Sequence, residues 1–113
     1  MVLLILKYLA AIATILTGAV SLFWPLRIRS FTGLEVVGGR GVTEIRTILG
    51  GFFIGLGAAV LLLNDPIAYQ TLGITYLVVA VVRTISMFVD KSVVQSNIIS
   101  AIAEVVLGVI LIL

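Results

Sequence analysis

The sequence contains no cysteine and no histidine. Without cysteine the chain cannot form a disulfide, a thiolate nucleophile or an iron–sulfur ligand. Without histidine it lacks an imidazole base, the usual haem ligand and the commonest ligand of catalytic zinc. We therefore expect no cofactor and no metal, and any chemistry must come from charged side chains, hydroxyls, amides or the backbone.

Charge is scarce as well. Only 11% of the 113 residues are charged and 62% are hydrophobic, whereas soluble domains have about 25% and 45–50%, respectively. A chain of 12.0 kDa cannot bury that much apolar surface against itself in water, so we expect the lipid bilayer to be its solvent. The net charge of +2 is too small to indicate a nucleic-acid partner.

Four apolar stretches are long enough to cross a bilayer, which needs about 20 residues per helix. We place them at residues 2–24, 42–63, 67–89 and 93–113, with short connections between them. They predict an all-α membrane protein, with one transmembrane domain over residues 1–113 that folds as an antiparallel four-helix bundle. Because Lys7 interrupts the first stretch, a retained span is favoured over a cleaved signal peptide.

The placement of the cations predicts an orientation. The first loop carries Arg27, Arg29 and Arg40 against one acid, Glu35, and the third loop carries Lys91. Because lysine and arginine are enriched in cytoplasmic loops, we expect both loops to be cytoplasmic and both termini to lie outside. The expected location is the inner (plasma) membrane of the cell, with a multi-pass topology.

The first loop is too apolar for a solvated linker. Six of its residues are leucine, isoleucine, phenylalanine or valine, which favours a segment that lies at the membrane interface. Phe23 and Trp24, at the end of the first span, suit the same interface. Three glycines between residues 38 and 41 predict a flexible connection to the second span.

Small residues recur along the spans at a spacing of about 3.5, which places them on one side of a helix. Two such faces compete in the second span, one with Gly50 and Gly57 and the other with Gly51 and Gly55 in a Gly-x-x-x-Gly pattern. Small residues let membrane helices approach closely. We therefore expect packing contacts, within the bundle or between copies, from Gly50, Gly51, Gly55, Gly57, Gly73 and Gly108.

Five ionisable residues lie within the spans or at their ends, namely Glu44, Arg46, Arg83, Asp90 and Glu104. A charge at the bilayer centre costs about 2.5–3.5 kcal/mol even on the most lenient scale. We expect these residues to converge with Ser86 and Ser100 in one polar cluster, where Arg83 reaches toward Glu104. Two interpretations stay open: paired charges that fix helix register, or a pocket for a small amphiphile, a lipid headgroup or an ion.

These polar and glycine positions resemble those of a known family. Three groups of residues are similar to the last three helices of small bacterial membrane proteins catalogued as domain of unknown function 4345. They are Glu44-x-Arg46 with Gly50-Gly51 and Gly55-x-Gly57, then Arg83-x-x-Ser86-x-x-x-Asp90, and finally Glu104-x-x-x-Gly108. The first span resembles them only in hydropathy, and Lys91-Ser92 stands where such proteins often have a glycine. The resemblance, which extends more distantly to the DoxX-like group, implies a four-helix fold but no activity.

Three functions stay open. A binding or transport module would use Arg46, Arg83 and Glu104, and we expect it to be a homo-oligomer because a four-helix protomer encloses little volume. A structural or assembly protein would use the same charges for packing only. An intramembrane enzyme, with Glu104 as acid or base and Arg83 orienting an anion, has the least support because nothing else matches a catalytic constellation.

Overall fold

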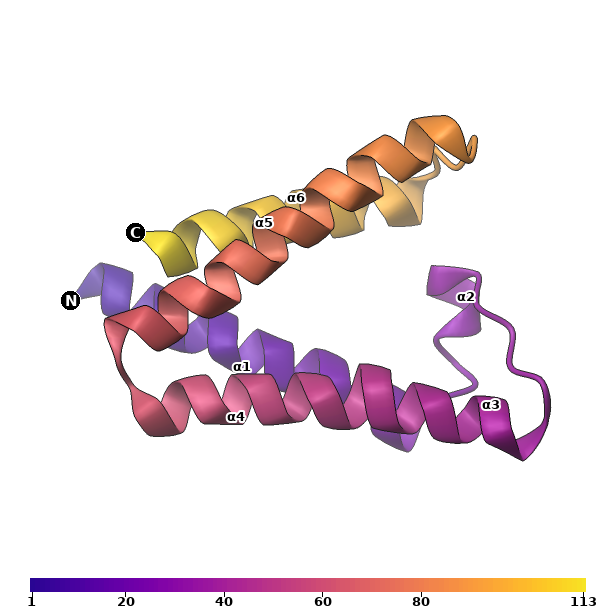
Figure 1. The fold of residues 1–113 in the computed structure, drawn as a ribbon, viewed down its shortest axis with the longest axis horizontal. Coiled ribbons are helices and arrows are strands. Elements are labelled where there is room, and N and C mark those ends of the chain that lie inside the picture. Colours follow the sequence, from indigo (N-terminus) through magenta and orange to yellow (C-terminus); the bar gives the residue numbers. More distant parts are fainter. The chain divides into compact units, whose positions relative to one another are not determined.

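The computed structural model describes all 113 residues and contains helices but no strand (Figure 1). Three segments, α3, η1 and α4, follow one another without a break and form a single helix from Gly38 to Leu63, of which η1 is π-helical. The predicted all-α fold is confirmed. The elements are α1 (Val2–Phe23), α2 (Arg29–Thr32), α3 (Gly38–Glu44), η1 (Ile45–Phe52), α4 (Phe53–Leu63), α5 (Pro66–Val89) and α6 (Gln95–Ile112).

Four of the helices are long and apolar enough to cross a membrane, as predicted. They contain 22, 26, 24 and 18 residues in chain order, and 22% of each apolar window is buried inside the protein. Most of their apolar side chains therefore face outward, which is stable only where the surrounding medium is itself apolar. The chain is a multi-pass membrane protein.

The second helix begins four residues earlier than predicted, at Gly38 rather than at residue 42. The glycine-rich connection that we expected to be flexible is helical instead. Two side-chain interactions hold this first turn: the Thr43 hydroxyl donates to the Gly39 carbonyl at 3.1 Å, and Arg40 pairs with Glu44 one turn further on. Pairs at this spacing stabilise a helix that glycine alone would weaken.

The turn between α4 and α5 is short because each of its residues suits its position. Asn64 takes φ 46°, a left-handed conformation that asparagine tolerates. The Asp65 carboxylate accepts a hydrogen bond from the Ile67 N–H at 2.8 Å and so caps α5. Pro66 follows in the first turn, where its missing N–H costs nothing.

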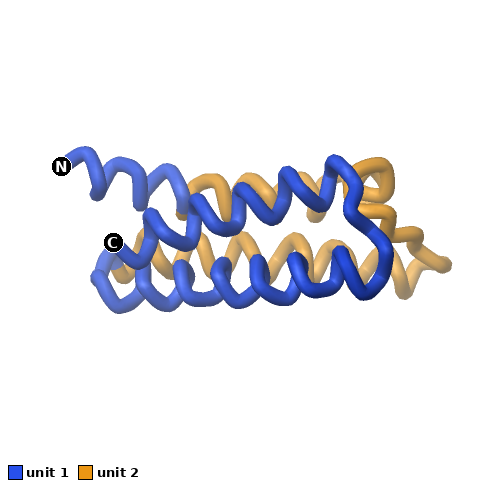
Figure 2. The backbone as a smooth tube through the Cα atoms, turned by 90° about the horizontal axis from the view of Figure 1, so that it is seen from above, with its two compact units in different colours: residues 1–10, 64–113 blue, residues 11–63 orange.

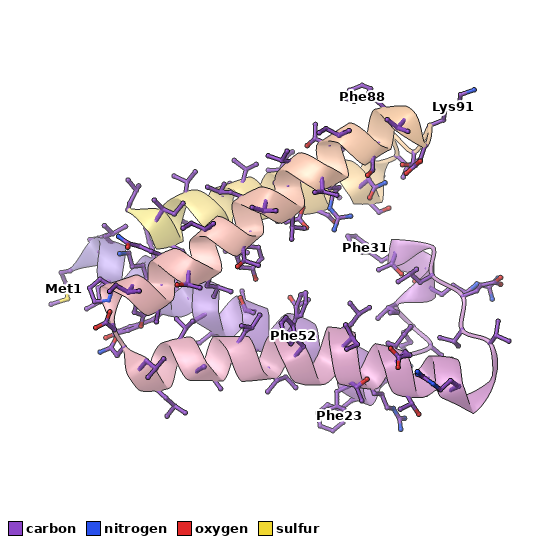
Figure 3. The ribbon with its side chains drawn as sticks, viewed as in Figure 1. Met1, Phe23, Phe31, Phe52, Phe88 and Lys91 are labelled. Carbon is purple, nitrogen blue, oxygen red and sulfur yellow. The ribbon has the colours of Figure 1, made fainter.

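The turn between α5 and α6 is equally sharp, although it has no glycine. Lys91 takes φ 53°, and the Ser92 N–H donates to the Met87 carbonyl at 2.9 Å, as in a Schellman motif. Figure 3 shows Lys91 projecting from this turn. A left-handed conformation at a residue other than glycine costs about 1–2 kcal/mol, and here the interhelical contacts described below hold it.

The chain divides into two compact units (Figure 2), and the boundary between them falls within α1. Unit 1 contains Met1–Ala10 and Asn64–Leu113, and therefore holds α5 and α6. Unit 2 contains Ala11–Leu63, with the rest of α1 and the Gly38–Leu63 helix.

In unit 2, glycines bring α1 and the Gly38–Leu63 helix into close antiparallel contact. A Cβ added at Gly18 would lie 2.6 Å from the Gly50 carbonyl oxygen, and one added at Gly57 would lie 2.7 Å from the Ala11 carbonyl oxygen. No side chain fits at such distances. The predicted packing role of Gly50 and Gly57 is therefore confirmed.

The second glycine face of the same helix does not pack inside unit 2. Gly51 and Gly55 are exposed, and a Cβ added at Gly55 would meet no atom within 4 Å. Of the two alternatives expected for the Gly-x-x-x-Gly pattern, a contact within unit 2 is not made. The reason is that only one side of the helix faces α1, and Gly50 and Gly57 occupy it. A contact of Gly51 and Gly55 with a second copy stays a prediction.

In unit 1, the first residues of α1 join α5 through aromatic contacts. Tyr69 is only 2% exposed. Its ring centroid lies 6.3 Å from that of Tyr8, the Lys7 Nζ lies 5.9 Å from the same ring, and its hydroxyl donates to Asn64 at 2.9 Å. Lys7 thus has a cation–π partner, which holds its ammonium group near the start of α1.

Candidate functional site

The candidate site lies between α5 and α6 of unit 1, two antiparallel helices that approach closely. A Cβ added at Gly73 would lie 2.9 Å from the Gly108 carbonyl oxygen, and one added at Gly108 would lie 2.7 Å from the Leu77 side chain. Both glycines therefore have the packing role that was predicted for them. The charged side chains lie further along the pair, toward the Lys91 turn.

Arg83 and Glu104 form an ion pair at that position. The Arg83 Nε donates to Glu104 Oε1 at 2.8 Å and its Nη2 donates to Glu104 Oε2 at 2.9 Å. This is the bidentate fork geometry, the strongest form of a charged pair in proteins. The contact that the sequence predicted between these two residues is confirmed.

The pair sits inside the membrane span. Glu104 lies nine residues into α6 and Arg83 six residues before the end of α5, which at 1.5 Å per residue places their Cα atoms about 14 and 9 Å from those helix ends. The Glu104 side chain is 12% exposed and that of Arg83 is 33% exposed. A carboxylate buried this deeply requires its partner, because an unpaired charge is very costly there.

Asn97 completes the cluster, and sequence reasoning missed it. The Arg83 Nη1 donates to the Asn97 side-chain oxygen at 3.0 Å, while the Asn97 amide nitrogen donates to the Ser92 carbonyl at 2.9 Å. The cluster is thereby tied to the backbone of the α5–α6 turn. The signal was available: Asn97 precedes Glu104 by seven residues, which is two helical turns and the same face.

The guanidinium is not fully used by these partners. It has five N–H donors, and Glu104 and Asn97 accept three of them. One donor on each Nη atom lies outside these three hydrogen bonds. Within a membrane span such donors require an acceptor, and water, a lipid or another ligand can supply one.

The remaining predicted residues of unit 1 lie outside this network. Ser86 and Ser100 are half-buried, and their hydroxyls do not hydrogen-bond to Arg83 or Glu104. Asp90 forms the C-cap of α5, where it is exposed and has no ion pair. These three are neighbours of the cluster rather than members of it.

The two predicted site residues of unit 2 differ from each other. Glu44 pairs with Arg40 in the same helix, and both are exposed. Arg46 is also exposed and has no carboxylate partner. A role for Glu44 or Arg46 in binding a ligand stays a prediction.

No three acidic residues come close enough together to form a candidate metal site. The chemistry available at the candidate site is therefore that of a paired guanidinium and carboxylate. Such a pair has no net charge, but it presents two directed N–H donors. Comparisons with family models, with curated proteins and with solved structures find no match for this chain, so the resemblance to the four-helix family stays a prediction.

Proposed function

We propose that this multi-pass membrane protein binds the polar group of a small amphiphile at the cluster of Arg83, Glu104 and Asn97. The observation that supports the proposal is the exposure of Arg83, whose side chain is one-third exposed and whose hydrogen bonds to Glu104 and Asn97 use three of its five N–H donors. An intramembrane ionisable group with unused donors is typical of a binding or transport site.

The arrangement favours some ligands over others. Glu104 neutralises Arg83, so a ligand gains directed hydrogen bonds rather than the attraction of a net charge. The fitting group is a carboxylate, phosphate or carbonyl oxygen at the end of an alkyl chain, because the surrounding helix surfaces are apolar. A simple inorganic ion gains less from this site than an amphiphile does.

The proposal includes a topology and an assembly. The cations of the first and third loops favour a cytoplasmic position for those loops and an outside position for both termini, in the inner membrane of a bacterial cell. A transport pathway in so small a protein requires a homo-oligomer, and the exposed face of Gly51 and Gly55 is available for contact with a second copy.

Binding is tested by thermal unfolding of the whole chain in a non-ionic detergent with added decanoate, decyl phosphate or 1-decanol. We expect the two anionic probes to raise the Tm and decanol to do so less. A ligand at 100 times its Kd stabilises a protein by about 2.7 kcal/mol. The effect should disappear in the Arg83→Leu/Glu104→Leu variant, which removes the site without leaving an unpaired charge.

The matched control is Arg40→Gln/Glu44→Gln, which removes an exposed pair of the other unit. It should respond to the probes like the wild type. If neither anionic probe stabilises the wild type, or if both still stabilise the Arg83→Leu/Glu104→Leu variant, the binding proposal is wrong.

A second candidate function is a structural or assembly role, and the bidentate closure of the ion pair favours it. Both carboxylate oxygens of Glu104 accept from Arg83, and Asn97 links the pair to the turn, so the network already fixes the register of α5 on α6. Under this function no amphiphile stabilises the protein.

A further inference from the structure

Two arginines of the chain are left without a carboxylate, and both belong to unit 2. Three of the five arginines form ion pairs, whereas Arg27 and Arg46 form none and are exposed. Four arginines and two glutamates fall between residues 24 and 46, which gives this segment a net charge of +2. The positive charge is therefore carried by specific side chains that lack partners inside the protein.

Arg27 and Arg46 lie at the same end of unit 2. A Cβ added at Gly50 would be 3.0 Å from the Leu22 Cβ, so the end of α1 rests on the Gly38–Leu63 helix at this point. The two helices are antiparallel. Arg27, five residues after Leu22, and Arg46, four residues before Gly50, therefore both lie beyond this contact on the same side.

The segment between these helices exposes large apolar side chains. It connects two membrane spans and contains only the short helix α2, so it lies at the membrane surface. Figure 3 shows Phe23 and Phe31 projecting from the ribbon. The exposed side chains are each at least 49% accessible, namely Phe23, Trp24, Leu26, Phe31, Leu34 and Val37.

We propose that residues 23–46 form an interfacial platform that binds anionic phospholipid. The apolar side chains enter the boundary between headgroups and acyl chains, as amphipathic interfacial segments do. Arg27 and Arg46 bind the headgroup phosphates, for which the planar guanidinium is well suited. Trp24, whose ring lies 6.0 Å from that of Phe23, occupies the depth that tryptophan prefers in a bilayer. The platform is independent of the Arg83–Glu104 cluster.

Trp24 is the only tryptophan of the chain and so reports directly on this platform. The full chain is reconstituted in mixed bilayers of phosphatidylcholine and phosphatidylglycerol, in which one lipid at a time carries brominated acyl chains that quench indole fluorescence. We expect brominated phosphatidylglycerol to quench Trp24 more strongly than brominated phosphatidylcholine at the same mole fraction. The difference should shrink as salt is added, because exposed charges are screened.

The arginines are tested by substitution. Arg27→Gln and Arg46→Gln should each lower the preference for phosphatidylglycerol about fivefold, and the double variant should remove it. Arg40→Gln/Glu44→Gln is the matched control, because it removes one arginine but leaves the net charge unchanged; it should keep the wild-type preference. Circular dichroism checks that every variant keeps its helix content.

Three results would overturn the proposal. The first is equal quenching of the wild type by the two brominated lipids, and the second is an undiminished preference in the Arg27→Gln/Arg46→Gln variant. The third is Trp24 emission that neither brominated lipid quenches, which would place the segment outside the bilayer.

Discussion

Units 1 and 2 each contain two antiparallel apolar helices that pack through glycine, but the arginines within these helices differ in whether a buried partner accepts their hydrogen bonds. In unit 1, α5 and α6 enclose Arg83 between Glu104 and Asn97. In unit 2, the contact between α1 and the Gly38–Leu63 helix contains no charge, and Arg46 is left exposed near the end of the helix. Glycine contact therefore suffices to join apolar helices, and a buried ion pair is an additional feature with a cost of its own.

The difference follows from the partners that each arginine meets, not from its distance to a helix end. Glu104 lies near the middle of α6, where a carboxylate without a partner is strongly unfavourable. Arg46 lies eight residues after the start of its helix, no closer to a helix end than Arg83, but its side chain is exposed and no carboxylate pairs with it, so its partner can be a lipid. The same residue type is thus fixed by the protein in one unit and left available to the membrane in the other.

The comparison is tested most strongly by breaking the ion pair of unit 1. Arg83→Leu leaves Glu104 buried without a partner and should lower the free energy of unfolding by about 3 kcal/mol, the lower end for buried pairs because Arg83 is one-third exposed. Adding Glu104→Leu should restore stability to within about 1 kcal/mol of the wild type. Denaturation in detergent micelles, monitored by circular dichroism, measures the stability of both variants. If the Arg83→Leu variant is as stable as the wild type, the ion pair does not contribute to stability as proposed.

The glycine contact of unit 2 is tested next. A Cβ at Gly57 would lie 2.6 Å from the Ile15 side chain and 2.7 Å from the Ala11 carbonyl oxygen, so Gly57→Ala should cost about 1–3 kcal/mol. Gly55→Ala is the control in the same helix, and it should be neutral or stabilising by up to about 1 kcal/mol. The same unfolding measurement compares them. Equal losses at both positions would show that the packing face is wrongly assigned.

The smallest effect is expected for the exposed ion pair of unit 2. Arg40→Gln/Glu44→Gln removes a pair within one helix, whose side chains are 77% and 51% exposed. Such pairs contribute about 0.3–0.5 kcal/mol, so the unfolding curve should hardly move. A loss as large as that of Arg83→Leu would remove the distinction between the paired charges of the two units.

Much of the fold followed from hydropathy. The ends of α1, α5 and α6 were predicted to within two residues, because Pro25, Pro66 and the short polar turns interrupt the apolar runs. The start of the second helix was missed by four residues. Glycine has a low helix propensity, so the sequence favoured a flexible connection there, whereas in the structure the Arg40–Glu44 pair and the Thr43 hydroxyl contribute a little to a first turn that continues the longer helix.

The candidate site was predictable only in part. Arg83 and Glu104 were evident, since charged residues inside apolar spans are rare and need partners. Asn97 was not identified, because its spacing of seven residues from Glu104 places it on the same helix face but does not show that it reaches Arg83. Lys91 in a left-handed turn was also unexpected, because the strain at that residue is outweighed by contacts elsewhere in the hairpin.

By itself, the sequence determined the solvent, the four apolar helices and the identity of the few charges that have to be accommodated. These properties depend on residue type summed along the chain, which is local information. The tertiary structure decided that Gly50 and Gly57 pack while Gly51 and Gly55 do not, and that Arg83 is paired while Arg46 is exposed. These outcomes depend on the rotation and register of one helix against another, which close backbone contacts set and no single helix encodes.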